Sequence, residues 1–219
     1  DIKTPLTSII NYVDLLKREN IQDPKIQGYL DILEAKAQRL KHLTEDVVEA
    51  SKISSGNITM EYMNINFVEM INQTTGEFAE KFEKRNLQIV LNVPEKPVMV
   101  RTDGRRMWRV IENIYNNAAK YALEGTRVYA DLIEKEHTVE FSLKNISEQP
   151  LNISADELTE RFIRGDVSRS TEGSGLGLSI AKNLTELQGG KFELYLDGDL
   201  FKVTIVFPKA VVGQSVTKS

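Results

Sequence analysis

The sequence contains no cysteine, which excludes disulfides, zinc–thiolate sites and cysteine nucleophiles together. Only two histidines, His42 and His137, occur among the 219 residues, so a histidine-rich metal site is also excluded. No apolar run reaches the ~20 residues of a membrane-spanning helix, and no signal peptide is visible. The sequence also lacks a large excess of charge of either sign, because 28 Lys and Arg residues are balanced by 32 Asp and Glu residues. This balance argues against binding nucleic acid through a broad basic face.

What is present fits a folded chain of one or two domains. The hydrophobic fraction of 41% is too high for a disordered segment, and the length suffices to bury a core. An amphipathic pattern is already under way at Asp1, with no capping residue in front of it. We therefore expect a piece of a longer protein, with a helix that begins upstream.

Residues 1–56 show helical periodicity. Apolar residues recur every three or four positions from Leu6 to Leu16, and residues 20–24 indicate a break. A heptad seam follows, made of Ile26, Leu30, Leu33, Ala37, Leu40, Thr44, Val47 and Ser51. We expect an antiparallel helical hairpin whose apolar stripes exceed what two helices can cover for each other. A homodimeric four-helix bundle is favoured over a monomeric hairpin that packs on the rest of the chain.

Residues 57–208 predict a second domain of the α+β class, followed by a frayed tail at 209–219. A helix is expected after a cap at Asn66, and another runs from a cap at Asp103 to Ala122. Strands are expected at 58–64, 87–93, 97–101, 127–134, 138–143, 191–196 and 201–207. Residues 146–172 are polar and irregular apart from a short helical stretch near 155–162, and a helix over 176–188 ends at Gly189-Gly190.

The run Gly173-Ser174-Gly175-Leu176-Gly177 precedes that last helix. Glycines ahead of a helix let backbone N–H groups close on an anion, which the helix N-terminus also favours. The run is not a P-loop, a Rossmann fingerprint or part of a protein Ser/Thr kinase signature, because the companion residues are missing. Taken alone, it is equally well explained as a turn that needs glycine for a positive φ.

Two further segments carry candidate chemistry. Asn113, Asn117 and Lys120 share one face of their helix. Amide oxygens are suitable ligands for Mg²⁺, and a lysine can bind a phosphate. A solvent-exposed polar stripe explains the same pattern equally well. In the segment Glu160–Asp166, Phe162 and Ile163 lie between arginines. This segment fits either a small apolar anchor or a hinged lid whose arginine reaches a phosphate.

The order of these pieces closely resembles that of sensor histidine kinases. Asn113–Tyr121 resembles the N box, Arg161–Asp166 the F box and Gly173–Gly177 the G2 box, while the opening D-I-K-T-P-L-T-S-I resembles the phosphoacceptor box. Each motif is weak alone, but four in the correct order are a specific signal. The resemblance implies a helical dimerisation hairpin followed by a Bergerat-type α/β sandwich that binds ATP and Mg²⁺.

The resemblance also implies roles for individual residues. Asn117 would ligate the Mg²⁺ that bridges the ATP phosphates, and Arg164 would lie near the terminal phosphate. Asp1 would act as an acid/base partner of the phosphoacceptor histidine, and Thr4 would orient water when the reaction runs in reverse on a response regulator receiver domain. The nucleotide would be lined by Asn113, Lys120, Tyr121 and Asn145 and cradled by Gly173, Ser174, Gly175, Leu176 and Gly177.

Two departures from the family pattern stand out. The family's histidine belongs immediately before Asp1, and neither His42 nor His137, which we expect to be exposed or packing residues, replaces it. The family's Asp-x-Gly-x-Gly element corresponds to Lys144–Gln149, where Asn145 stands in place of the Asp and both glycines are missing. A neutral amide can still accept a hydrogen bond from the adenine amino group, but we expect modest affinity.

The leading hypothesis is thus an ATP-dependent protein-histidine kinase of two-component signalling. It would be the cytoplasmic portion of a membrane-anchored sensor, reaching the membrane only through a part upstream of Asp1. A degenerate kinase that only dimerises and docks partners is the second hypothesis. A different Bergerat-fold ATPase, such as a chaperone or topoisomerase subunit, is the third, and the heptad hairpin argues against it. Titration with nucleotide in the presence of Mg²⁺ separates the first two.

Overall fold

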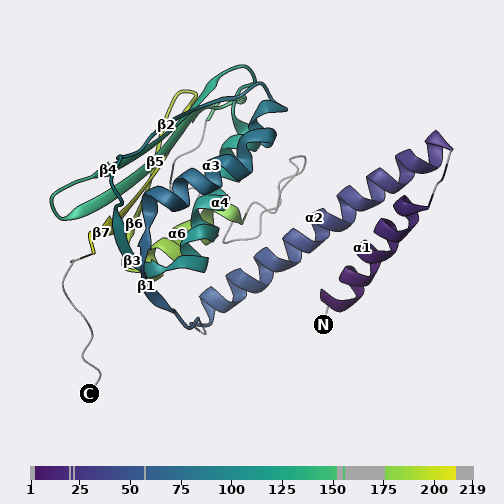
Figure 1. The fold of residues 1–219 in the computed structure, drawn as a ribbon, viewed down its shortest axis with the longest axis horizontal. Coiled ribbons are helices and arrows are strands. Elements are labelled where there is room, and N and C mark those ends of the chain that lie inside the picture. Colours follow the sequence, from purple (N-terminus) through teal and green to yellow (C-terminus); the bar gives the residue numbers. More distant parts are fainter. Residues whose placement is uncertain are drawn as a thin grey trace. The chain divides into compact units, whose positions relative to one another are not determined.

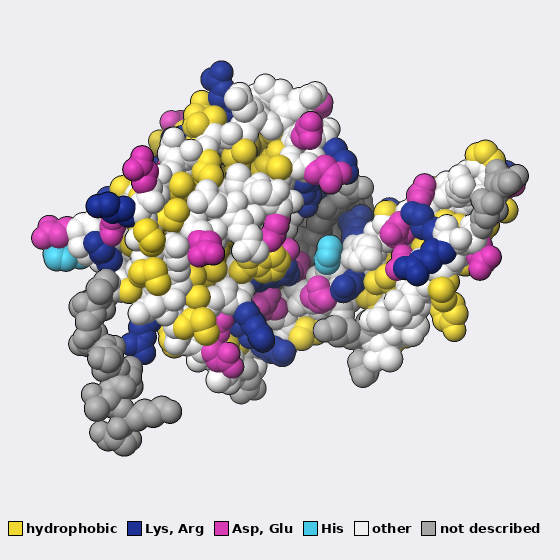
Figure 2. Space-filling view, viewed as in Figure 1, with side chains coloured by type: hydrophobic (Ala, Val, Ile, Leu, Met, Phe, Trp, Pro, Cys, Tyr) yellow, Lys and Arg dark blue, Asp and Glu magenta, His cyan; other side chains and the backbone are white. Residues whose placement is uncertain are grey.

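The structure is a computed structural model that describes residues 3–19, 21, 23–56, 58–151, 155 and 176–210. The chain divides into two compact units, one holding a helical hairpin and the other a sheet covered by helices (Figure 1). Acidic and basic side chains are interspersed over the face shown in Figure 2. No helix within the described ranges is both long enough and apolar enough to span a membrane.

The hairpin consists of α1 (Lys3–Arg18) and α2 (Pro24–Ser54), which meet across the break expected at residues 20–24. Asp23 caps α2, its carboxylate accepting from the backbone N–H of Lys25 at 2.8 Å. At the same end the ammonium of Lys17 lies 2.7 Å from Asp31 and 2.5 Å from Glu34. These contacts tie α1 to the third turn of α2.

The heptad seam of α2 contains both buried and exposed apolar positions. Leu30 and Ala37 are only 6% and 7% exposed. Leu6 and Val13 of α1 are buried as well. The seam positions between them recur every seven residues and are 43–57% exposed: Ile26, Leu33, Leu40 and Val47. Two helices therefore leave one apolar stripe of α2 uncovered, as the sequence predicts.

The second unit contains a five-stranded sheet in the order β2-β4-β5-β7-β6 and a two-stranded sheet β1-β3. Strands β2 and β4 are parallel and the other neighbours are antiparallel. The elements are β1 (Tyr62–Asn66), α3 (Phe67–Glu83), β2 (Gln88–Asn92), β3 (Met99–Asp103), α4 (Gly104–Tyr121), β4 (Arg127–Glu134), β5 (Thr138–Ile146), α6 (Gly177–Leu187), β6 (Lys191–Asp197) and β7 (Leu200–Pro208). The helices α3, α4 and α6 lie against one face of the larger sheet, so the expected helical hairpin and α/β sandwich are both confirmed (Figure 1).

The core lies between this helical layer and the sheet. Alternate residues of the strands point inward and are buried, including Phe141 and Leu143 of β5. The ring of Tyr115 stacks on Phe141 with centroids 6.3 Å apart and meets the edge of Phe78 at 5.4 Å. The Tyr115 hydroxyl pairs with the Thr75 hydroxyl at 2.8 Å, and burial raises the pKa of Tyr115 to about 12. Helices α3 and α4 are thus fixed on the centre of the sheet.

Several element boundaries differ from the predicted ones. Strand β1 begins at Tyr62 instead of residue 58, because the Asp103 carboxylate, not a strand partner, accepts from the backbone N–H of Glu61 at 2.9 Å. Strand β3 runs to Asp103, β5 continues to Ile146, and α6 begins one residue later than expected. Asn66 precedes α3 as predicted, but its side chain makes no capping bond. His42 and His137 are both exposed, as expected.

Asp103 links three segments and provides a test of the fold. Its carboxylate also accepts from the backbone N–H of Arg106 at 3.1 Å, which caps α4. Burial raises the pKa of Asp103, but hydrogen bonds from the backbone N–H groups of Glu61, Arg106 and Arg105 outweigh burial and lower it. The charged form is therefore favoured in the folded state.

Asp103→Asn is expected to destabilise the α/β unit by about 1 kcal/mol at pH 7, because a neutral amide replaces a carboxylate at a helix N-terminus. Since the pKa is lowered on folding, the wild-type advantage is present above a pH of about 4 and is lost as the pH falls through the folded-state value. Urea unfolding of both proteins at several pH values measures this difference. If the difference in unfolding free energy between the two proteins stayed constant down to pH 3, the Asp103 carboxylate would not be the stabilising group.

Candidate functional site

The predicted amide face lies on α4. Asn113 is 8% exposed, and Asn117, Lys120 and Tyr121 are half-buried. The Asn113 amide nitrogen, Nδ2, is buried and has no hydrogen-bond partner among the residues that the structure describes. Leaving a buried donor unpaired costs about 1–3 kcal/mol, so this atom is available to a ligand acceptor. The alternative of a solvated polar stripe fails for Asn113.

The glycine run reaches this face through its last residue. A Cβ atom built on Gly177, the first residue of α6, would lie 3.3 Å from Oδ1 of Asn113, a separation that few real Cβ atoms show. A side chain at position 177 would therefore need the Asn113 amide to move by a few tenths of an ångström, so glycine lets the start of α6 approach Asn113 without that shift. The positive end of the α6 dipole and the amide face of α4 are adjacent, an arrangement suited to an anion. Leu176 directly precedes Gly177 and is half-buried.

Asn145 lies next to a segment that bonds to the end of α4, and it carries a second unpartnered amide atom. It lies on β5, in alternation with the inward-facing Phe141 and Leu143, and is 3% exposed. Its Nδ2 donates to the backbone carbonyl of Ile146 at 3.1 Å, whereas its Oδ1 is buried with no partner in the described part of the chain. The orphaned atom here is an acceptor, in contrast to the orphaned donor on Asn113.

Backbone hydrogen bonds join the end of α4 to the segment after Asn145. The N–H of Leu123 donates to the Ile146 carbonyl at 2.8 Å, and the N–H of Glu148 donates to the Tyr121 carbonyl at 2.8 Å. The Lys120 ammonium donates to the Tyr121 hydroxyl at 2.9 Å and lies 4.7 Å from the centre of its ring. The structure therefore connects Lys120 and Tyr121 to the strand that carries Asn145.

Other predicted site residues lie elsewhere or outside the description. Thr4 is exposed on α1, in the hairpin unit, and its carbonyl accepts from the Ser8 hydroxyl at 3.2 Å. Asp1, Arg164, Gly173, Ser174, Gly175 and the remainder of the F-box segment fall outside the described residues.

Arg85 is a residue that sequence reasoning missed. It follows α3, and its guanidinium donates to the carbonyls of Ala119 and Lys120 at the end of α4 and pairs with Glu148. A lone arginine between Lys84 and Asn86 belongs to no motif and no helical face. Only the folded chain reveals this contact.

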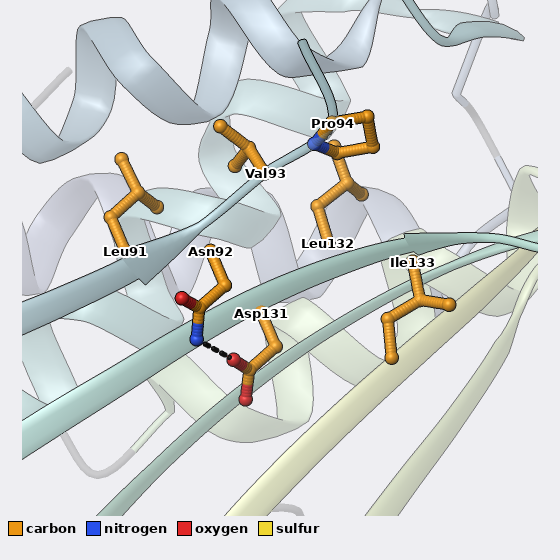
Figure 3. A pocket seen from close by; sticks show the side chains of 7 residues that line it. All are labelled: Leu91, Asn92, Val93, Pro94, Asp131, Leu132 and Ile133. Carbon is orange, nitrogen blue, oxygen red and sulfur yellow. Dashed lines mark hydrogen bonds between the residues drawn. The ribbon is translucent and has the colours of Figure 1, made fainter.

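A shallow pocket at the other end of the sheet lacks these features. It has a volume of about 580 Å³ and is lined by Leu91, Asn92, Val93, Pro94, Asp131, Leu132 and Ile133 (Figure 3). The Asn92 amide donates to the Asp131 carboxylate at 2.6 Å, and Lys144 also pairs with Asp131 at 3.3 Å. The polar groups of this pocket satisfy one another, so the site between α4, α6 and β5 is the stronger candidate.

The donors and acceptors of that site suggest its ligand. An unpartnered N–H beside a helix N-terminus favours a phosphate, and an unpartnered acceptor on β5 favours an amino group, as an adenine ring has. No group of three or more His, Asp or Glu side chains is gathered for a metal ion in the described part of the chain. A metal here would take its ligands from an amide oxygen together with phosphate oxygens and water.

Comparison with known proteins agrees with this arrangement. Residues 102–211 match the family of histidine kinase-, DNA gyrase B-, and HSP90-like ATPases, and residues 1–56 match the His Kinase A (phospho-acceptor) domain. Sensor protein VanSC of Enterococcus gallinarum is 31% identical over 212 residues, which cover 95% of this chain and 58% of the relative. The chain thus spans less than two thirds of that relative's length.

Solved structures share the fold. Full-length ShkA in complex with AMPPNP superposes with a TM-score of 0.77 at 19% identity, covering 96% of this chain and 45% of that one. Histidine kinase ThkA in complex with response regulator protein TrrA gives a TM-score of 0.64 at 22% identity, covering 94% and 58%. The chain belongs to the histidine kinase-, DNA gyrase B- and HSP90-like ATPase family, and its His Kinase A domain marks it as part of a two-component sensor histidine kinase.

Proposed function

We propose that this chain is the dimerisation and ATP-binding part of an autophosphorylating protein-histidine kinase. The γ-phosphoryl group of ATP would pass to a histidine of the dimer and then to an aspartate of a response regulator. We place the phosphoacceptor hairpin at residues 1–56, the catalytic domain at 57–208 and a tail at 209–219. The observation that carries the proposal is that one unit holds two buried amide atoms with no partner among the described residues, a donor on Asn113 and an acceptor on Asn145.

In this proposal, different residues bind the adenine and the phosphates of the nucleotide. Asn145 accepts from the adenine amino group, and Tyr121 and Lys120 line the nucleotide next to it. Asn113 donates to a phosphate, with Gly173, Ser174, Gly175, Leu176 and Gly177 as the backbone cradle. Arg164 would lie near the terminal phosphate. This supports phosphoryl transfer, because that reaction needs mainly positioning and neutralisation of charge.

We assign the magnesium site to Asn117. Its amide oxygen is a hard neutral ligand, and its place one turn after Asn113 puts it on the phosphate side of the same helix face. Magnesium would neutralise charge that develops on the phosphate oxygens. Mg²⁺ characteristically takes one or two protein ligands plus phosphates, so a single amide suffices.

The hairpin supplies the acceptor side of the reaction. We place the phosphoacceptor histidine immediately before Asp1, with the Asp1 carboxylate as the group that handles the imidazole proton. Thr4, one turn further along, is exposed and free to orient a water molecule in the reverse reaction. The TrrA complex of ThkA supports a response regulator receiver domain as the partner.

We further propose that two copies associate through the hairpins. The open stripe of Ile26, Leu33, Leu40 and Val47 repeats every seven residues, as a helix-bundle interface requires. Large apolar side chains of α1, among them Ile9 and Leu16, are also exposed, and apolar groups lie at the hairpin surface in Figure 2. We also propose that the dimer belongs to the cytoplasmic portion of a membrane-anchored sensor.

Isothermal titration of the chain with AMPPNP tests the nucleotide site. We expect saturable binding at one site per protomer, weakened about tenfold or more when EDTA replaces Mg²⁺, because the phosphate charge is then less neutralised. The absence of measurable binding would favour the degenerate kinase that only dimerises and docks partners.

A further inference from the structure

We propose that Arg85 is a positioning residue for the nucleotide. Its guanidinium holds the last turn of α4 against the segment after Asn145, so that these two segments keep a fixed spacing. This inference rests on the proposed function, because it assigns a role in the same nucleotide site. Arg85 itself is not placed in contact with the ligand.

The contacts of Arg85 reach both segments at once. Nη1 donates to the carbonyl of Ala119 at 3.2 Å and to the carbonyl of Lys120, while Nη2 lies 2.9 Å from the Glu148 carboxylate. Ala119 and Lys120 belong to α4, and Glu148 lies three residues after Asn145. A single side chain from the end of α3 therefore bridges the two elements.

The carbonyls that Arg85 binds are the ones a helix end leaves unsatisfied. The last four C=O groups of a helix lack intrahelical partners, and the negative end of the dipole favours a cation there. The planar guanidinium presents several N–H donors in a fixed fork, so it can bind two carbonyls and a carboxylate together. A lysine in its place carries a charge but not this geometry.

The effect extends to the residues proposed to touch the base. The Glu148 N–H donates to the Tyr121 carbonyl at 2.8 Å, and Ala122 pairs with Ser147 in a β-bridge. These bonds extend the contacts of Arg85 toward Asn145, whose Oδ1 has no hydrogen-bond partner within the described ranges. Loosening the end of α4 would therefore shift Lys120 and Tyr121 relative to the Asn145 acceptor.

The carbonyl contacts, not the ion pair, should carry most of this effect. The Glu148 side chain is 55% exposed and the Arg85 side chain 26% exposed. Exposed ion pairs contribute little to stability. The carbonyls at the end of α4, by contrast, receive hydrogen bonds from a charged donor, which are stronger than those from a neutral one. The structure thus predicts a larger effect from Arg85→Ala than from Glu148→Gln.

The test is titration of the full chain and its variants with AMPPNP and with GMPPNP in Mg²⁺. For Arg85→Ala we expect the Kd for AMPPNP to rise about tenfold and the preference for AMPPNP over GMPPNP to shrink, with an unchanged binding stoichiometry, because small misplacements are costly in preorganised sites. Arg85→Lys should recover part of the loss, and Glu148→Gln should change the Kd by less than about threefold.

Two controls separate positioning from stability. Lys135→Ala removes a surface ion pair with Glu140 in the same unit, away from α4, and should leave both Kd values unchanged. A purely structural role for Arg85 would lower the melting temperature or the binding stoichiometry while leaving the Kd and the purine preference as in the wild type, and that result overturns the inference alone. If the wild-type chain binds neither nucleotide, the proposed function fails and this inference fails with it.

Discussion

Replacing Asn117 by alanine is expected to abolish magnesium-dependent nucleotide binding while leaving the dimer intact. The substitution removes the one protein oxygen that we assign to the metal. The triphosphate would then face the site with its charge poorly compensated, and a loss of binding on the order of 100-fold is expected. The α4 backbone should be unaffected, because alanine is a better helix former than asparagine.

Asn116→Ala is the matched control for this variant. Asn116 is also half-buried on α4, but its Oδ1 accepts from the Lys81 ammonium at 2.5 Å, so its side chain is directed toward α3. Titration with AMPPNP, with and without EDTA, should separate the two variants clearly. Sedimentation should give the wild-type mass for both, since the open stripe of α2 is untouched. Unchanged magnesium-dependent affinity in Asn117→Ala would refute the metal assignment.

The fold was predictable from sequence wherever one physical signal dominates. The α2 heptads, the Asp103 cap of α4 and the Gly189-Gly190 stop of α6 each place an element boundary within one or two residues. In the last case Gly189 adopts a positive φ of 79°, and the N–H of Gly190 donates to the Thr185 carbonyl, closing the helix end. Local geometry suffices for such boundaries.

The errors arose where tertiary pairing decides. Alternation predicts a strand from residue 58, but β1 extends only as far as β3 can pair with it, from Tyr62 to Asn66. The apolar character of Trp108 on α4 would suggest burial, yet its side chain is 36% exposed. A helical wheel gives the direction of a side chain and not the extent of the neighbour that covers it.

The site shows the same division. The shared face of Asn113 and Asn117 follows from spacing alone, but sequence could not decide between a solvated stripe and a ligand site. Burial of Asn113 with an unpartnered Nδ2, and the approach of Gly177 to it, favour the ligand site. The role of Arg85 needed the fold, since its partners lie 34 to 63 residues away in the chain.

The second large effect is expected on the acceptor side. We predict that a chain extended by about two helical turns, with a histidine placed immediately before Asp1, takes up acid-labile phosphate from ATP. The extension continues α1, which begins at Lys3, so the imidazole would lie on a helix with Asp1 beside it. The imidazole nitrogen attacks the γ-phosphorus, ADP leaves, and the resulting P–N bond is the one that acid hydrolyses.

Incorporation of labelled phosphate from ATP, followed by acid treatment, measures this reaction. The matched control carries glutamine in place of the added histidine and should incorporate on the order of 100-fold less label, because positioning cannot compensate for a missing nucleophile. Asn117→Ala in the extended chain should lose the label as well, which would tie the acceptor to the nucleotide site. If the extended chain binds AMPPNP with Mg²⁺ yet takes up no label, the kinase assignment is refuted while the nucleotide site is supported. The two results are independent, because nucleotide binding and phosphoryl acceptance depend on different units of the molecule.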